Sequence, residues 1–358
     1  MFRRAAVGLY LRFTGPFLRR HKIPFTDVLK NAERILIRPP SGPGELLFSL
    51  PTIETIKRNY PDSEVSLLIP ERKIELVTGT ALADRIIVYS EPLVPFGSKF
   101  RDLKKGLRKL RFDLYLDLNR PGDQDRRLLA SLGAAKVRIG NSNGRDFPYL
   151  NWEVRPSGHE RDEVNRNLSM LSWIDESKRV LMHPDGRFVG VADRLWLEDF
   201  LLSRSWVQDE KRVIVDLTIP GTRRGWGTES LVDILKGLEQ LCSPRLFVIP
   251  PPDYETKKGF FDLSKHVTRQ VILFNEPVSR ITSLMEKSNL ILSSKSDLFS
   301  LGFALGIPCI LLIPEDEKFY PPEAEWVRIF RLKRGKKVPS GEIVGAAAGL
   351  LEKERSAQ

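Results

Sequence analysis

The sequence contains little cysteine and little histidine. Among its 358 residues there are only two cysteines and four histidines, namely Cys242, Cys309, His21, His159, His183 and His266. They are scattered and lack the close spacing of zinc ligands, which argues against a zinc site and against a disulfide framework. This usage favours a reducing compartment such as the cytoplasm.

Long apolar runs are also missing. The longest runs have the length of a strand, whereas a membrane-spanning helix needs about 20 apolar residues. Hydrophobic residues make up 41% of the chain and charged residues 29%, which is typical of globular proteins and unlike disordered or membrane-embedded chains. The length of 358 residues is enough for two domains with separate cores.

Acidic residues are absent from the first 22 positions. Six cations there supply +6 of the formal net charge of +11: Arg3, Arg4, Arg12, Arg19, Arg20 and Lys22. If this segment is helical, one face carries its larger apolar side chains, namely Phe2, Ala6, Leu9, Tyr10, Phe13 and Phe17. Gly15 and Pro16 should bend the helix or end it early. The short stretch AAVGLYL, with arginines on both sides, does not resemble a secretory signal.

Two interpretations of this basic segment remain open. In the first, residues 1–22 lie on an anionic membrane surface and hold a cytoplasmic protein at the inner face of the cytoplasmic membrane. In the second, the helix packs on the body of the protein and its basic face is solvated. Nucleic acid is not an expected partner, because no recognised nucleic-acid-binding module occurs and the rest of the chain is only mildly basic.

From residue 33 onward, short apolar strands alternate with helical patterns. The first series of predicted strands is RILI, EVSLLI, RIIVY, DLYLDL and KVRIG, and the second is RVIVDL, RLFVIP, QVILF, LILSS and PCILLI. Amphipathic segments such as KFRDLKKGLRKL and TESLVDILKGLEQL separate them. This alternation predicts two parallel sheets, each covered by helices on both faces.

The predicted fold class is therefore α/β, with two Rossmann-like, doubly wound domains that face a central cleft. Ligands of such folds bind beside the carboxyl ends of the strands. We expect a basic amphipathic extension over residues 1–32, a first domain over 33–180, a second domain over 181–340 and a closing helix over 341–358. The two domains are an approximate structural duplication rather than a sequence repeat.

Several segments, in the same order, resemble family 9 glycosyltransferases, the heptosyltransferases that build the inner core of lipopolysaccharide. The first is ILIRPPSGPGELLFSLPTIETIKRNYPDSEVSLLI, followed by YLDLNR, VRIG and HERDEVNRNLSML. PGTRRGWGTESL and LILSSKSDLFSLGFALGIPCILLIP resemble the later signatures of the family. The resemblance covers about residues 33–330.

This resemblance implies a GT-B fold in which the first domain holds the acceptor and the second holds the nucleotide-sugar. It implies an inverting transfer of a heptose from ADP-heptose to an anionic, lipid-linked glycan, without a metal or other cofactor. Such a displacement needs a base for the acceptor hydroxyl and positive charge beneath the departing diphosphate.

Glu45 is the candidate base. In the family an aspartate normally stands at this position and is the catalytic base, so glutamate keeps the acid chemistry but moves the carboxylate by one methylene. On the acceptor side, Gly42 and Gly44 would let the backbone approach a substrate closely. The alternative is that Glu45 only balances the dipole of the helix that follows it.

Two loops of the second half supply donor-side candidates. In PGTRRGWG, the resemblance implies that Thr222, Arg223 and Arg224 bind the leaving diphosphate, with Arg224 where the family usually has lysine. In VIPPPDYE, Asp253 or Glu255 occupies the loop that binds the nucleotide ribose in the family.

The segment KSDLFS departs most from the family pattern. Lys295 replaces an aspartate, Asp297 replaces a glycine and Ser300 replaces a histidine, while Ser296 is unchanged. Asp297 would repel a diphosphate, or it caps the following helix. Either donor binding is rearranged, with Lys295 paired to phosphate, or the donor site is impaired.

Arginines gather in the later loops of the first half. They are Arg120, Arg126, Arg127, Arg138 and Arg145. An acceptor with phosphates and acidic sugars would suit them, and solvated surface charges are the alternative. Asp123 and Asp125 resemble an acidic pair that binds metal in another glycosyltransferase fold, but they precede a helix and are expected to cap it.

Three functions remain open on this evidence. The first is the heptosyltransferase-like enzyme. The second is a family member that has lost transfer and binds a nucleotide or a lipid as an assembly partner. The third is a transferase of this fold that uses another nucleotide-sugar.

Overall fold

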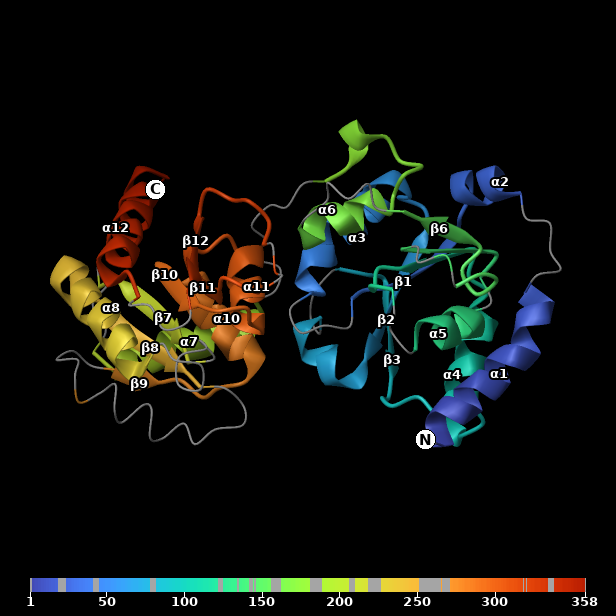
Figure 1. Ribbon diagram of the computed structural model, residues 1–358, viewed down its shortest axis with the longest axis horizontal. Coiled ribbons are helices and arrows are strands. Elements are labelled where there is room, and N and C mark those ends of the chain that lie inside the picture. Colours follow the sequence, from blue (N-terminus) through green and yellow to red (C-terminus); the bar gives the residue numbers. More distant parts are fainter. Residues whose placement is uncertain are drawn as a thin grey trace. The chain divides into compact units, whose positions relative to one another are not determined.

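The chain divides into two compact units, Met1–Met182 and His183–Gln358 (Figure 1). The computed structural model describes residues 2–18, 24–40, 45–77, 82–121, 125–133, 135–141, 144, 146–155, 162–180, 189–205, 210–217, 227–250, 265, 271–317, 319, 321–333 and 338–357. No helix in this part of the chain is long and apolar enough to cross a membrane.

The first unit is built on a six-stranded parallel sheet with the order β3-β2-β1-β4-β5-β6. Its strands are β1 (Arg34–Arg38), β2 (Glu64–Pro70), β3 (Arg85–Tyr89), β4 (Leu114–Asp117), β5 (Val137–Asn141) and β6 (Trp152–Val154). Its helices are α1 (Phe2–Leu18), α2 (Phe25–Lys30), α3 (Leu50–Asn59), α4 (Ser98–Leu110), α5 (Arg126–Gly133) and α6 (Glu163–Ser169), with short 3₁₀ turns at Leu47–Ser49, Glu71–Leu76 and Glu176–Lys178. This strand order is that of a Rossmann fold.

The second unit repeats this topology. Its parallel sheet has the order β12-β11-β10-β7-β8-β9. The strands are β7 (Arg212–Asp216), β8 (Arg245–Ile249), β9 (Val271–Leu273), β10 (Leu290–Ser293), β11 (Cys309–Pro314) and β12 (Val327–Leu332). The described helices are α7 (Val191–Ser203), α8 (Gly227–Cys242), α10 (Val278–Glu286), α11 (Asp297–Ala304) and α12 (Ser340–Ala357). The predicted fold class, with two Rossmann-like halves, is therefore confirmed.

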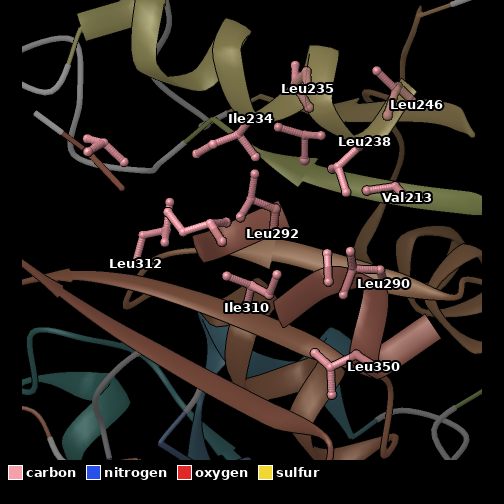
Figure 2. Packing of buried hydrophobic residues seen from close by; sticks show 14 of the residues in the cluster. Val213, Ile234, Leu235, Leu238, Leu246, Leu290, Leu292, Ile310, Leu312 and Leu350 are labelled. Carbon is pink, nitrogen blue, oxygen red and sulfur yellow. The ribbon is translucent and has the colours of Figure 1, made fainter. Parts of the chain in front are cut away.

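The core of the second unit forms where α8 and α12 cover one face of its sheet (Figure 2). Leu235 and Leu238 of α8 and Leu350 of α12 are buried with Leu292 and Ile310 of the central strands. Close packing of the two helices needs Gly237, because a Cβ there would lie 2.6 Å from Val344 of α12. The closing helix predicted from the sequence is thus α12, an integral part of this core.

The N-terminal helix differs from its prediction in two ways. Of the two outcomes expected at Gly15 and Pro16, a bend or an early end, the early end is wrong, because the helix continues to Leu18. Its predicted apolar face is also divided, because Tyr10 is buried against the first unit while Phe13 and Phe17 are exposed. Gly15 is buried against Tyr149, whose hydroxyl donates a hydrogen bond of 2.7 Å to the carbonyl of Leu11. This packing holds the second half of the helix on the body of the unit.

Candidate active site

The carboxyl ends of β1 and β4 form a buried polar cluster in the first unit. Arg38 and Asp117 are register partners in the sheet, and the Arg38 guanidinium donates to the Asp117 carboxylate at 3.2 Å. Both side chains are almost completely buried. The Tyr115 hydroxyl donates to the same carboxylate at 2.9 Å, and burial first, then the Asp117 charge, raises the pKa of Tyr115 well above its ordinary value. Tyr115 therefore stays a protonated donor.

The same cluster fixes the backbone that leads out of β1. The Asn119 side-chain amide donates to the Pro39 carbonyl at 2.9 Å and to the Asp117 carboxylate at 3.1 Å. The buried ammonium of Lys73 donates to the Pro40 carbonyl at 3.1 Å. Prolines also restrict this backbone. The start of the loop that precedes Glu45 is thus held by side chains from two other segments.

Glu45 lies half-buried in the turn that follows this loop. The next regular elements are the 3₁₀ turn Leu47–Ser49 and then α3, whose first turn contains no acidic residue. The dipole explanation of Glu45 stays open, since the 3₁₀ turn that follows runs directly into α3. Among the described residues, no hydrogen bond or ion pair engages its carboxylate. Gly42 and Gly44 lie outside the described residues.

Two of the acceptor-side candidates are buried inside the first unit. Arg138 donates to the carbonyls of Ala135, Tyr149 and Pro148 at 2.6, 2.6 and 3.0 Å, and its burial lowers the pKa of the guanidinium to about 10. Arg126 donates to the Asn141 carbonyl at 2.6 Å. These contacts hold β5 and the segments before and after it in place, and they do not favour a direct contact of either arginine with an acceptor.

The other two candidates reach the surface. Arg120 has an exposed side chain and pairs with the buried carboxylate of Glu163 at the start of α6. Arg127 of α5 donates to Asp146 at 2.7 Å and is partly exposed. Arg145 lies outside the described residues. Arg120 and Arg127 are therefore the members of this group that an anionic ligand could reach.

Gly140 makes room for the buried Arg126 side chain. A Cβ at residue 140 would lie 2.3 Å from Nη2 of Arg126 and 2.5 Å from Cδ1 of Leu150. We expect Gly140→Ala to lower the free energy of unfolding of the first unit by about 1–3 kcal/mol, the usual cost of overpacking, as measured by urea denaturation. Gly106→Ala is the matched control, because nothing lies within 4 Å of a Cβ there and alanine favours the helix. Equal stabilities of the two variants would contradict this explanation.

In the second unit a second buried carboxylate lies at the carboxyl end of β7. Asp216 is completely buried and accepts hydrogen bonds of 2.6 Å from the hydroxyls of Ser293 and Ser296. The Ser296 hydroxyl also accepts the Phe299 amide at 3.3 Å and so caps α11. Asp216 thereby ties the end of β7 to the loop between β10 and α11, which contains two donor-side candidates.

Lys295, the second of these candidates, already forms an ion pair within the protein. Its ammonium lies 2.9 Å from Glu317 and 5.3 Å from the centre of the Phe319 ring. Asp297 is exposed in the first turn of α11, and the capping side chain is that of Ser296. The prediction that Asp297 caps this helix is therefore wrong by one residue. Thr222, Arg223, Arg224, Asp253 and Glu255 lie outside the described residues.

The acidic residues of the two units do not form a metal site in the described part of the chain. No group of three or more potential ligands is found among those residues. Asp125, which was expected to cap α5 together with Asp123, directly precedes α5 and its carbonyl accepts the Leu129 amide at 2.8 Å. Its carboxylate pairs with Arg3 of α1, and Asp123 lies outside the described residues. The charged candidate groups that are not buried in the described structure are therefore one carboxylate, that of Glu45, and three cations, those of Arg120, Arg127 and Lys295.

Sequence reasoning did not single out the two buried carboxylates. Asp117 and Asp216 each end an apolar strand, in DLYLDL and RVIVDL. A carboxylate that ends an apolar strand of a parallel sheet lies at the edge where ligands bind. That signal was present in both segments. Tyr115 and Asn119, which donate to Asp117, are only two residues away. The other partners of the two carboxylates come from distant parts of the chain, namely Arg38, Ser293 and Ser296.

Comparisons with known proteins identify the fold. No family model matches the chain, and no curated protein matches it. A family 9 glycosyl transferase from Veillonella parvula is similar in structure, with a TM-score of 0.75 and 16% identity over 90% of this chain and 97% of that one. The Escherichia coli ADP-heptose lps heptosyltransferase II gives a TM-score of 0.71 with 16% identity, over 90% and 99%. A UDP-GlcNAc 2-epimerase from Methanocaldococcus jannaschii gives 0.53 with 14% identity, over 90% and 94%.

Identities of this size establish a shared fold and not a shared reaction, since one fold serves several chemistries. The transferases are more similar in structure to this chain than the epimerase is. The chain therefore has the α/β fold, with two Rossmann-like halves, of the family 9 glycosyltransferases that its sequence segments resemble.

Proposed function

We propose that this protein is an inverting glycosyltransferase that moves a heptose or a related sugar from a nucleotide-sugar to a lipid-linked inner-core lipopolysaccharide acceptor. The observation that carries the proposal is Glu45, a half-buried carboxylate in the turn after β1, in a segment that resembles the family along its whole length. ADP-heptose is the first donor to test, because one structural neighbour is named for it.

In this proposal Glu45 removes the proton from the acceptor hydroxyl. The acceptor oxygen attacks the anomeric carbon from the face opposite the diphosphate, and the bond between that carbon and the diphosphate oxygen breaks. Thr222, Arg223 and Arg224 would stabilise the negative charge that develops on the diphosphate. Asp253 or Glu255 would bind the ribose, and no metal is required.

On the acceptor side, Arg120 and Arg127 would bind phosphates or acidic sugars of the glycan. Both already pair with carboxylates, Glu163 and Asp146. Each of these buried carboxylates also pairs with a second arginine, Arg166 for Glu163 and Arg126 for Asp146, so it keeps a cation when an anionic ligand binds the more exposed guanidinium. Residues 1–22 would bring the protein to the inner face of the cytoplasmic membrane, where a lipid-linked acceptor resides.

A second candidate function is a member that binds a nucleotide or a lipid without transfer. The observation that favours it is made in the β10–α11 loop. There the Ser296 hydroxyl donates its hydrogen bond to Asp216, and the Lys295 ammonium pairs with Glu317, so both donor-side candidates already have protein partners.

The deciding experiment incubates the protein with a panel of nucleotide-sugars and an inner-core lipid acceptor in the presence of membranes. Transfer from a donor other than ADP-heptose would change the sugar but retain the enzyme. Nucleotide binding without transfer from any donor would favour the second candidate.

Lys295 and Glu317 allow a test of the donor site itself. If Lys295 binds the diphosphate, Lys295→Met should weaken ADP binding by roughly 10- to 150-fold, since one charge-assisted hydrogen bond contributes about 1.5–3 kcal/mol. Glu317→Gln should strengthen ADP binding, because the ammonium no longer has a competing carboxylate. Isothermal titration with ADP measures both. Unchanged affinity in both variants would remove Lys295 from the donor site.

A further inference from the structure

The most exposed apolar side chains of the first unit gather around α1. Leu9, Phe13 and Phe17 are 51–67% exposed and recur every four residues, so they form one stripe along the helix. Phe96 is also exposed, and its ring lies 5.9 Å from that of Tyr10. Phe147 is exposed as well, next to Pro148 and Tyr149, which contact Gly15.

Helix α4 lies beside α1 and brings a dense set of cations to the same region (Figure 1). The Tyr10 ring packs edge to face on Phe100 of α4 at 5.0 Å, and the Lys104 ammonium lies 5.2 Å from the centre of the Tyr10 ring. The cations of α4 are Lys99, Arg101, Lys104, Lys105, Arg108 and Lys109. Arg101, Lys105 and Arg108 are exposed and share one face with Lys104, because they are three or four residues apart.

Negative charge is nearly absent from these two helices. Helix α1 contains no acidic residue and presents Arg4 and Arg12 at its surface, and α4 contains only Asp102. A solvated basic helix would not also expose a stripe of phenylalanine and leucine. Exposed aromatic side chains bordered by lysine and arginine are instead typical of surfaces that lie at the headgroup level of a bilayer.

The helix pair is held rigidly on the first unit. Arg3 of α1 pairs with Asp125 and donates to the carbonyl of Leu93 at 3.1 Å. The Tyr149 hydroxyl binds the other half of the helix. Because Asp125 directly precedes α5, this contact anchors α1 next to the helix that carries Arg127, one of the two arginines that an anionic ligand could reach.

From these observations we infer that α1 and α4 form one two-helix docking surface for an anionic phospholipid bilayer. Phe13, Phe17 and their apolar neighbours enter the headgroup region, while the cations of α4 bind lipid phosphates. This inference deepens the membrane contact of the proposed function, since it adds α4, Phe96 and Phe147 to the N-terminal segment.

The test uses the full-length protein and flotation with vesicles of phosphatidylcholine alone or mixed with phosphatidylglycerol. Binding is expected only to the mixed vesicles and should weaken in high salt. Arg101→Gln/Lys105→Gln should lower the partition coefficient about 30-fold, because each cation near the membrane surface contributes about 1 kcal/mol to binding. Phe13→Ser/Phe17→Ser should lower it roughly 10-fold or more. Both pairs are exposed, so folding is expected to be retained.

Matched controls lie in the second unit. Val191→Ser/Leu195→Ser removes two exposed apolar side chains at the same spacing, and Lys236→Gln/Lys287→Gln removes two exposed cations. Both controls should bind vesicles as the native protein does.

Equal binding to neutral vesicles, or no effect of the α4 substitutions, would overturn the two-helix surface. So would a dimer that depends on Phe13 and Phe17, or RNA binding that depends on Arg101. Because the assay contains no donor or acceptor, its failure is distinct from a failure of glycosyl transfer.

Discussion

Glu45→Gln is expected to lower kcat of glycosyl transfer by about 10²–10⁴-fold, the usual contribution of a positioned general base. Glutamine has almost the same shape as glutamate, so the turn before the 3₁₀ segment should keep its conformation. What changes is the ability to accept the proton of the acceptor hydroxyl. Initial rates with the best donor of the nucleotide-sugar panel, at saturating acceptor, measure the effect.

Binding experiments separate this role from a structural one. ADP affinity and the unfolding midpoint of Glu45→Gln should equal those of the native protein, because the side chain has no hydrogen bond or ion pair among the described residues. Glu45→Asp should retain part of the activity, since the family that this segment resembles usually has aspartate at this place and the carboxylate moves by only one methylene. Full activity of Glu45→Gln would eliminate Glu45 as the base.

The succession of strands along the chain was readable from the sequence because most central strands are short, largely apolar runs. EVSLLI and PCILLI, for example, form β2 and β11, which are buried on both faces. The strand β12 was not predicted, because two arginines interrupt the apolar residues of VRIFRL. It lies at the edge of its sheet, where one side has no neighbouring strand. The three residues of β6 are too few to produce a pattern.

The candidate site was less readable, and its arginines show why. Arg126 and Arg138 resemble Arg120 in the sequence, yet the first two bind buried carbonyls and the third is exposed. Burial of an arginine depends on partners from other segments, such as Asn141 and Tyr149, and on the space that Gly140 leaves. Spacing along the chain contains no information on these partners. Lys73 was missed for the same reason, since its acceptor, the Pro40 carbonyl, comes from a different segment.

The second large effect is expected for stability. Asp117→Asn should lower the free energy of unfolding of the first unit by about 3–5 kcal/mol, the cost of removing one partner from a buried ion pair. The substitution preserves the shape of the side chain but leaves the buried Arg38 cation without its carboxylate. It also weakens the acceptor for the Tyr115 hydroxyl. Urea denaturation measures the loss of stability. Hydrogen exchange of the peptides that contain β1 and β4, followed at each urea concentration, shows that the loss occurs in the first unit.

The double variant Arg38→Met/Asp117→Asn tests the physical reason. It removes the buried cation together with the charge that balanced it, so it should be more stable than Asp117→Asn alone. A double variant as unstable as the single one would mean that the hydrogen bonds of Tyr115 and Asn119, rather than the ion pair, stabilise the cluster. The outcome also bears on catalysis, because Arg38 begins the backbone segment that leads to Glu45. Recovered stability without recovered transfer would show that the cluster positions the base in addition to stabilising the sheet.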